Sequence, residues 1–317
     1  SSRRGTRCAA IRDFSSWLRN TMPSFKTTLG LTLKRGAVRG RLSETPLLLQ
    51  NQGYLRDSIF IVTHRFFLLL LFVVATSARA DWHVGASESE IDAGERVEHR
   101  HVVVNSDSGE QAILELALFS TRSATLRVID NAEAKDDLAA AMQRENCIAG
   151  VNGGYFDPSF APIGLRVLDG KTTRPLTRAR LLTGVLSASA PRGVEIIRLG
   201  EFSRQRKLDA AIECGPFLVD LGLAVHGLDE TRGARRTFVA VARGGKAALG
   251  SCSSVSLAQL AEILATPKLS ESFTIWRAMN LDGGSSSAFW CRRSDGRAFS
   301  ISEDKRVRDF LGVVAKP

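Results

Sequence analysis

The sequence predicts an α+β domain with an extended mixed β-sheet core and a few short helices. Three observations support this fold class. After residue 80, many short runs rich in Val, Ile and Leu are separated by turn residues, only two segments have helical periodicity, and Asp-Gly and Gly-Gly pairs join neighbouring runs. Because strands and helices do not alternate along the chain, a doubly wound fold is disfavoured.

The strand-like runs are either apolar throughout or alternate between apolar and polar residues, as central and half-buried strands do. They cover residues 100–104, 112–119, 125–129, 147–151, 164–168, 171–173, 184–188, 194–198, 210–213, 237–242, 247–249 and 311–314. Asp169-Gly170 and Gly244-Gly245 suit the positive backbone angles of tight hairpin turns. The sequence therefore predicts hairpins at both places.

Two segments have the spacing of amphipathic helices. Residues 136–144 place Leu138, Ala141 and Met142 on one face. Residues 256–264 place their leucines on one face, and Ser256 is suited to cap the first turn. We expect short helices at both places.

Residues 1–80 are read as a leader outside the folded domain, which we place at residues 81–317. His64 and Arg65 precede the apolar run 66–75, and Ala78-Arg79-Ala80 follows it. A basic start, about ten apolar residues and a small-residue exit describe a secretory signal peptide at about 64–80, cleaved after Ala80. A membrane-spanning helix needs roughly 20 apolar residues, so an uncleaved anchor is the weaker alternative. Residues 1–60 are Arg-rich and aperiodic, as in a disordered tail or an over-extended reading frame.

The net charge of +10 lies entirely in this leader. Residues 1–80 hold 13 Lys and Arg against 3 Asp and Glu, and the remainder holds 30 against 30. A nucleic-acid partner requires a basic face on the folded body, which this balance does not indicate. The expected location is periplasmic or secreted, without a stable membrane anchor once the signal peptide is removed.

Four cysteines fall in the predicted domain: Cys147, Cys214, Cys252 and Cys291. In an oxidising compartment an even number favours disulfides, and four cysteines allow three pairings. The preferred pairing joins Cys147 to Cys214 and Cys252 to Cys291. No C-x-x-C or Cys/His spacing indicates a zinc site, and no cofactor is expected, although the carboxylates leave a divalent cation open.

Two glycine-rich loops follow buried strands and are the best candidates for a binding site. The first reads VNGGYFDP at residues 151–158, and the second reads MNLDGGSSS at residues 279–287. Paired glycines let the backbone approach a ligand and expose N–H donors, while adjacent Asn and Asp side chains provide directed polar groups. A single such loop is often only a tight turn, but two in one domain favour a site.

Two further segments contribute charged residues that are candidates for the same site. IECGPFL at residues 212–218 puts Glu213 at the end of a strand, and RRT at residues 235–237 puts Arg236 before another. A surface carboxylate and a solvated basic pair are the simpler alternatives. Arg236 has functional meaning if its planar guanidinium grips a phosphate or carboxylate.

Together these motifs resemble the phosphodiester glycosidase family, from about Leu126 to the C-terminus. The family includes the lysosomal uncovering enzyme, which removes N-acetylglucosamine from phosphodiester-linked glycans, and bacterial exported relatives. The NLDGG string at residues 280–284 is the specific marker. This sequence departs from the family pattern at Tyr155, Ala240 and Ser285, where Phe, Gly and Gly are usual.

The resemblance implies an exported hydrolase that cleaves the bond between a sugar and an anomeric phosphodiester, with a small-molecule or glycan substrate. Glycosidases generally use two carboxylates, and we assign Asp282 to activating water or stabilising charge at C1 and Glu213 to the partner acid/base role. Arg236 and the N–H groups of the glycine pairs would hold the phosphate. The expected substrate-binding residues are Asn152, Gly153, Gly154, Asp157, Asn280, Gly283, Gly284, Ser285 and Ser286.

Several alternatives remain at this stage. Asp282 could simply cap its Gly-Gly turn. A serine nucleophile among Ser285, Ser286 and Ser287 is disfavoured because there is no G-x-S-x-G elbow and no histidine in a triad context. The protein could also be a noncatalytic envelope module that binds glycan or peptidoglycan, or a phosphodiesterase that cuts P–O instead of C–O.

Overall fold

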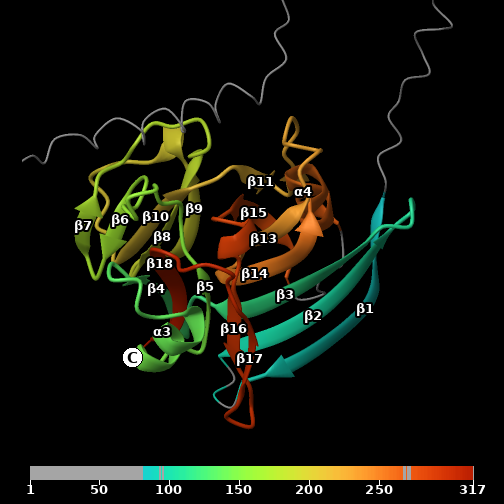
Figure 1. The fold of residues 1–317 in the computed structure, drawn as a ribbon, viewed down its shortest axis with the longest axis horizontal. Coiled ribbons are helices and arrows are strands. Elements are labelled where there is room, and N and C mark those ends of the chain that lie inside the picture. The colour runs from blue at the N-terminus through green and yellow to red at the C-terminus, as the bar shows by residue number, and fades with distance from the viewer. Residues whose placement is uncertain (1–80, 93, 95, 267–268, 270–272, 317) are drawn as a thin grey trace, which may run out of the picture. The chain divides into compact units, whose positions relative to one another are not determined.

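The computed structural model describes residues 81–316 except 93, 95, 267–268 and 270–272 (Figure 1). Its strands form three sheets, and all the strand ladders among these residues are antiparallel. The predicted signal peptide lies outside the described residues, and the domain boundary at residue 81 stays a prediction. No helix in the described part of the chain is long and apolar enough to cross a bilayer.

The largest sheet has eight strands in the order β1-β2-β3-β14-β13-β15-β11-β12. Their bounds are β1 Trp82–Ile91, β2 Val97–Ser106, β3 Gln111–Ser120, β14 Lys246–Val255, β13 Ala234–Ala242, β15 Ile275–Asn280, β11 Phe217–Asp220 and β12 Leu223–Ala224. Helix α4, Leu257–Ala265, covers one face of this sheet, and its Leu260 and Leu264 pack in one cluster with Leu114 and Ala240.

The other two sheets have five strands each. One has the order β17-β16-β5-β18-β4, with bounds Ala298–Ile301, Phe289–Arg292, Ala149–Asn152, Asp309–Ala315 and Ala124–Asp130. The second has the order β7-β6-β10-β8-β9, with bounds Lys171–Arg174, Arg166–Leu168, Ala210–Cys214, Gly184–Ser189 and Gly193–Arg198. Short 3-10 turns lie at Leu199–Glu201 (η1) and Gly284–Ser286 (η2).

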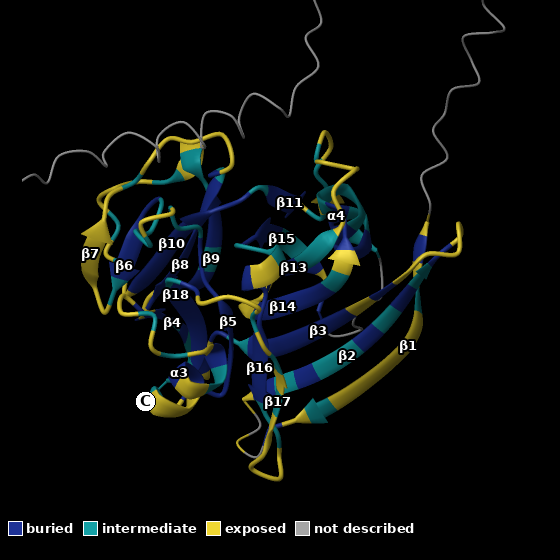
Figure 2. Ribbon diagram, in the orientation of Figure 1, coloured by how far each residue is buried: buried dark blue, intermediate teal, exposed yellow. Residues whose placement is uncertain are grey.

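The three sheets share one central core. Leu249 from the eight-stranded sheet, Val151 and Leu311 from the second sheet and Ile212 from the third belong to the same buried cluster. The outer face of the second sheet is covered by helix α3, Leu138–Arg144. The outer face of the third sheet is covered by connecting segments, including Leu176, Phe202 and Leu208. Figure 2 shows strands β10 and β8 of this sheet as buried.

The β-dominated core with few helices is confirmed, but one extended mixed sheet is not what forms. Strongly twisted sheets rarely exceed about ten strands without splitting, and this chain has more strands than one sheet can hold. Hairpin connections also favour antiparallel pairing. At the Asp169-Gly170 turn both residues have positive φ, 44° and 80°, as predicted.

The predicted helices form with defined caps. Asp137 accepts a hydrogen bond from the Ala140 N–H, and helix α3 therefore begins at Leu138, two residues later than predicted. Ser256 and Gln259 make a reciprocal capping box at the start of α4. Strand β1 was missed because its sequence is polar and mostly exposed, so it lacks an apolar pattern.

The predicted disulfides are wrong, since all four cysteines are free and buried. The members of each predicted pair lie in different clusters: Cys147 packs beside α3 and Cys214 in the central core, while Cys252 packs under α4 and Cys291 in the central core. Burial raises the pKa of each thiol to about 12. The cysteines therefore serve as small apolar core residues.

We predict that dithiothreitol leaves the Tm of the folded domain unchanged, because no cross-link constrains the unfolded chain. Thiol reagents should react slowly with the native protein and rapidly with Cys147, Cys214, Cys252 and Cys291 after denaturation. Thermal melts with and without reductant, together with thiol titration, check this. A clear fall in Tm on reduction would contradict it.

Candidate active site

The two glycine-rich loops meet where strands β5 and β15 end. The Asp282 N–H donates to the Gly153 carbonyl over 3.2 Å, and the Asn152 amide donates to the Asp282 carbonyl over 2.8 Å. These strands belong to different sheets, so the contact joins the two. Segments 130 residues apart in sequence thus lie side by side.

The side chain of Asn152 connects these segments through hydrogen bonds. Its side-chain oxygen accepts hydrogen bonds from the Thr237 hydroxyl over 2.7 Å and from the Ala288 N–H over 3.1 Å. Its amide nitrogen is occupied by the Asp282 carbonyl and, at 3.5 Å, by that of Gly153. The side chain is fully buried and its polar atoms are used within the protein. This geometry makes Asn152 a positioning residue, whereas the sequence indicated a contact with substrate.

A buried ion pair lies beneath the first glycine loop. Arg166 Nε donates to Asp309 Oδ2 over 2.7 Å, and the two side chains are 1% and 3% exposed. Asp309 Oδ1 also accepts the Gly154 N–H, and its main-chain carbonyl accepts the Gly153 N–H, both over 2.8 Å. Carbonyls of Ile163, Leu165 and Tyr155 take further Arg166 N–H groups.

This arrangement corrects the role predicted for the first glycine pair. A Cβ on Gly153 would lie 1.9 Å from Asp309 Oδ1, and one on Gly154 would lie 2.1 Å from Arg166 Nη2. Both N–H groups are already bonded to Asp309 and are unavailable to a phosphate. The glycines are required because the ion pair approaches their backbone closely.

Asp282 is the partly buried carboxylate at the centre of this region. Burial raises its pKa above the ordinary value of 3.8, and the nearby Asp309 acts in the same direction. Ser286, Lys305 and the Gly283 N–H, which donates to Asp282 Oδ1 over 2.9 Å, oppose that rise in pKa. The Ser286 hydroxyl lies near the carboxylate without a hydrogen bond of good geometry. Asp282 therefore does cap its own turn, while its second oxygen stays available.

Tyr155 and Asn280 connect the two loops to the Cys214-Gly215-Pro216 segment. The Tyr155 hydroxyl donates to the Gly215 carbonyl over 2.7 Å and accepts from the Asn280 amide over 3.0 Å. Burial raises the pKa of Tyr155 well above its ordinary value, so the phenol stays protonated. The side-chain oxygen of Asn280 is buried and has no hydrogen-bond partner in the described part of the chain.

Glu213 is not brought to Asp282. Its neighbours Ile212 and Cys214 point into the central core, and the nearby Asp282 carboxylate contributes to the raised pKa of Cys214. Because successive side chains of a strand point to opposite faces, Glu213 points to the outer face, where Ala211 also packs. Fully buried, it accepts the Leu165 N–H over 2.8 Å and the Thr177 N–H over 2.9 Å. Its predicted acid/base role therefore lacks the required access to substrate.

Arg236 lies beside the second loop but is largely committed to the main chain. Its Nε donates to the Val255 carbonyl over 2.9 Å and its Nη2 to the Arg232 carbonyl. Its aliphatic part packs 3.9 Å from where a Gly283 Cβ would stand. Burial lowers the pKa of Arg236, and the guanidinium keeps N–H groups beyond these two bonds.

Lys305 is a cation that the motifs did not indicate. Its main-chain N–H donates to the Ser285 carbonyl over 3.2 Å, its Nζ lies 5.2 Å from the centre of the Phe156 ring, and its charge lowers the pKa of Asp282. Lys305 lies in the connection before β18, where no pattern marks a site. Its position beside the second glycine loop is evident only from its main-chain hydrogen bond to Ser285 in the folded protein.

Of the remaining predicted residues, Asp157 has a structural role in its own turn, whereas Gly284 and Ser285 are accessible beside Asp282. Asp157 Oδ1 accepts the N–H groups of Ser159 and Ala161, both over 2.9 Å, so this carboxylate organises its own loop. Gly284, at φ 64°, has open space around its Cα, and no acceptor among the described residues takes its N–H. Ser285 is exposed next to it. Within the described ranges, no three His, Cys, Asp or Glu side chains gather as metal ligands would.

The profile of the phosphodiester glycosidase family matches residues 145–314, more than half of the chain and both glycine loops. The chain belongs to this family. No curated protein sequence matches it. Family membership agrees with the resemblance read from the NLDGG motif.

Solved structures show that the fold is shared. The catalytic domain of zebrafish N-acetylglucosamine-1-phosphodiester alpha-N-acetylglucosaminidase, auto-inhibited by its pro-peptide, is 14% identical with a TM-score of 0.54, covering 76% of this chain and 96% of that one. A hypothetical protein from Synechocystis is 15% identical with a TM-score of 0.51, covering 75% and 68%. At identities of 14% and 15%, this similarity shows that the fold is shared and does not assign roles to individual residues of this chain.

We predict that Asp309→Asn or Arg166→Met destabilises the protein by about 3–5 kcal/mol, because each leaves its buried partner without a counter-charge. Chemical denaturation monitored by circular dichroism measures the change. The matched control is Asp295→Asn, which removes a solvent-exposed Arg297 ion pair and should leave the unfolding midpoint unaltered. Equal effects of the two aspartate substitutions would contradict this account.

Proposed function

We propose that the protein is an exported hydrolase that cleaves the glycosidic bond of a sugar linked through an anomeric phosphodiester. Membership of the phosphodiester glycosidase family supports a hydrolase of this kind. The observation that carries the proposal is Asp282, a carboxylate of the second glycine loop whose pKa burial raises, which is bonded through its main chain to the first loop and lies beside Lys305. Perturbed carboxylates in such settings are candidates for catalysis.

The reaction breaks the bond between C1 of the sugar and the phosphate oxygen through an oxocarbenium-like state. The departing phosphate monoester is a good leaving group, so protonating the departing oxygen contributes little. The main demands are to activate water, to stabilise positive charge at C1 and to hold the departing phosphate. One carboxylate and nearby cations can meet these demands without a second acid.

Asp282 is proposed to take the proton from water and to stabilise the charge at C1. A carboxylate with a raised pKa is a stronger base than an ordinary aspartate. The Gly283 N–H holds Oδ1, which leaves Oδ2 for water. Asn152 acts through the main chain by bonding the Asp282 carbonyl.

The phosphate is proposed to bind beside the second loop. The Gly284 N–H, the Lys305 ammonium and the remaining N–H groups of Arg236 are the donors available there. Ser285 and Ser286 flank the carboxylate. The unpartnered oxygen of Asn280 is buried, so Asn280 is assigned to orienting the Tyr155 hydroxyl. Glu213 is assigned a positioning role through Leu165 and Thr177.

We predict that Asp282→Asn lowers kcat on a sugar 1-phosphodiester at least about 100-fold, since general-base and electrostatic terms are each of this size. The assay measures reducing sugar released by the purified protein. Asn keeps Oδ1 as acceptor for the Gly283 N–H, so circular dichroism should show an unchanged fold.

The control for this experiment is Asp295→Asn, a distant exposed aspartate, which should retain full turnover. Unchanged turnover by Asp282→Asn would refute the catalytic assignment. A wild-type protein that binds the substrate and never releases sugar would instead support a noncatalytic envelope module.

The raised pKa of Asp282 gives a pH signature. If the ionised carboxylate is the working form, kcat/KM falls on acidification, and the midpoint of that fall lies above the ordinary aspartate value of 3.8. A pH–rate profile measured from pH 3 to 8 on the wild-type protein tests this. A fall centred at or below the ordinary value would contradict the assignment.

The raised pKa of Asp282 also predicts that its ionised carboxylate lowers the stability of the folded protein at neutral pH. A carboxyl whose pKa is raised by folding stabilises the fold below its unfolded pKa, near 3.8, and this contribution is lost as the pH rises through the raised folded pKa. At pH 7 Asp282→Asn should therefore raise the Tm while abolishing turnover. The gain should shrink as the pH is lowered, and thermal melts at pH 4 and pH 7 measure it.

A further inference from the structure

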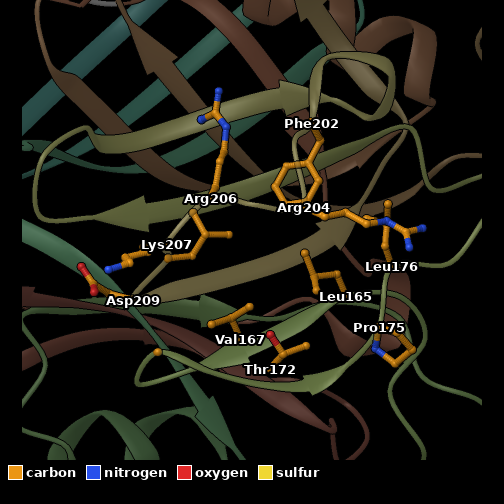
Figure 3. A pocket seen from close by; sticks show the side chains of 12 residues that line it. Leu165, Val167, Thr172, Pro175, Leu176, Phe202, Arg204, Arg206, Lys207 and Asp209 are labelled. Carbon is orange, nitrogen blue, oxygen red and sulfur yellow. The ribbon is translucent and has the colours of Figure 1, made fainter.

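A cavity lies on the outer face of the β7-β6-β10-β8-β9 sheet, and Asp282 is not among its lining residues. Its volume is about 580 Å³, within the range of about 300–1,000 Å³ that small-molecule pockets occupy. Leu165 and Val167 point into it (Figure 3). Arg166, between them in the strand, lies on the opposite face and pairs with Asp309. The sheet therefore separates this cavity from the glycine loops.

The floor of the cavity and part of its walls are apolar side chains. Leu165 and Val167 from the sheet, Leu176 and Pro175 from one connection, and Phe202 from another line it. In Figure 3 the Phe202 ring stands across the cavity from Val167. Thr172 contributes the one side-chain hydroxyl of the lining. Such a surface accommodates a chain without polar atoms and offers few partners to a peptide.

The rim of the cavity is cationic. The segment 203–207 reads SRQRK, and Arg204, Arg206 and Lys207 all line the cavity. Arg206 is paired with Glu195 over 2.8 Å, whereas Arg204 and Lys207 are exposed and have no ion pair among the described residues. Asp209 is the one acidic lining residue, and its Oδ2 already accepts the Ala190 N–H.

We propose that this cavity binds a single-chain lipid with an anionic head group. The alkyl chain would lie on Leu165, Val167 and Phe202, and the head group would bind Arg204 or Lys207 at the rim. Charge complementarity and the near absence of polar groups in the floor favour this ligand over an acidic peptide, which requires hydrogen bonds for its backbone. The site is independent of the proposed hydrolysis at Asp282.

The test is calorimetric titration of the full-length protein with octyl and decyl phosphate below their micelle concentrations. A fully buried methylene strengthens binding about fourfold, so a partly open cavity predicts about 5- to 15-fold tighter binding of decyl than of octyl phosphate. Inorganic phosphate should bind at least about 100-fold more weakly than decyl phosphate, because it cannot use the apolar floor.

Two variants locate the binding. The double substitution Arg204→Glu and Lys207→Glu should weaken decyl phosphate binding about 10-fold or more, and Leu176→Gln should reduce the advantage of the longer chain. The matched control is Arg122→Glu with Arg192→Glu, two exposed arginines outside the lining, which should change nothing. Circular dichroism confirms that each variant is folded.

The proposal is overturned if decyl phosphate shows no saturable binding at millimolar concentration. It is also overturned if affinity is insensitive to chain length, if the control pair weakens binding as much as the rim pair, or if an acidic peptide binds as tightly. Asp282→Asn should bind decyl phosphate like the wild type, so loss of hydrolysis and loss of lipid binding are separable.

Discussion

The Arg166–Asp309 ion pair is the interaction on which the site depends. It links β6 of one five-stranded sheet to β18 of the other, and the two oxygens of the Asp309 carboxylate serve the guanidinium and the first glycine loop at once. A buried pair of this kind is costly to desolvate, so it is stable only because further carbonyls satisfy the remaining Arg166 N–H groups. The loop that follows β5 is thereby fixed in one conformation.

A second set of hydrogen bonds, made by Asn152, then positions Asp282, the candidate catalytic residue. Once Gly153 and Gly154 are fixed by Asp309, Asn152 can reach both Thr237 and the Asp282 carbonyl, which brings the eight-stranded sheet to the same point. The central core that the three sheets share maintains this meeting point. Asp282 is therefore held by its backbone, which leaves part of its side chain free for chemistry.

The strands, helix caps and hairpin turns could be predicted because they follow local periodicity and turn chemistry. The meeting of the Asn152 and Asp282 loops could also be anticipated, because each follows a buried strand. The division into three sheets could not, since antiparallel partners are chosen by long-range packing that no local pattern encodes. The disulfide prediction failed because an even cysteine count does not distinguish cross-links from core packing.

Residue roles were harder to predict than positions. Strand β10 reads AAIEC, and its alternation places Glu213 on the opposite face from Cys214. The sequence therefore contained evidence about the direction of Glu213. Pairing two carboxylates only because of their residue type ignores that evidence. Arg166, Asp309 and Lys305 carry no motif, and their importance arises only from contacts made after folding. The motif drew attention to the first glycine pair, but the group that approaches its backbone closely is the internal Arg166–Asp309 ion pair.

We propose that this site hydrolyses the C1–O bond of a sugar 1-phosphodiester. Turnover in ¹⁸O-labelled water, with both products analysed by mass spectrometry, tests it most directly. We expect the label on the anomeric hydroxyl of the released sugar and none in the phosphate. Label in the phosphate would show P–O cleavage and contradict the account.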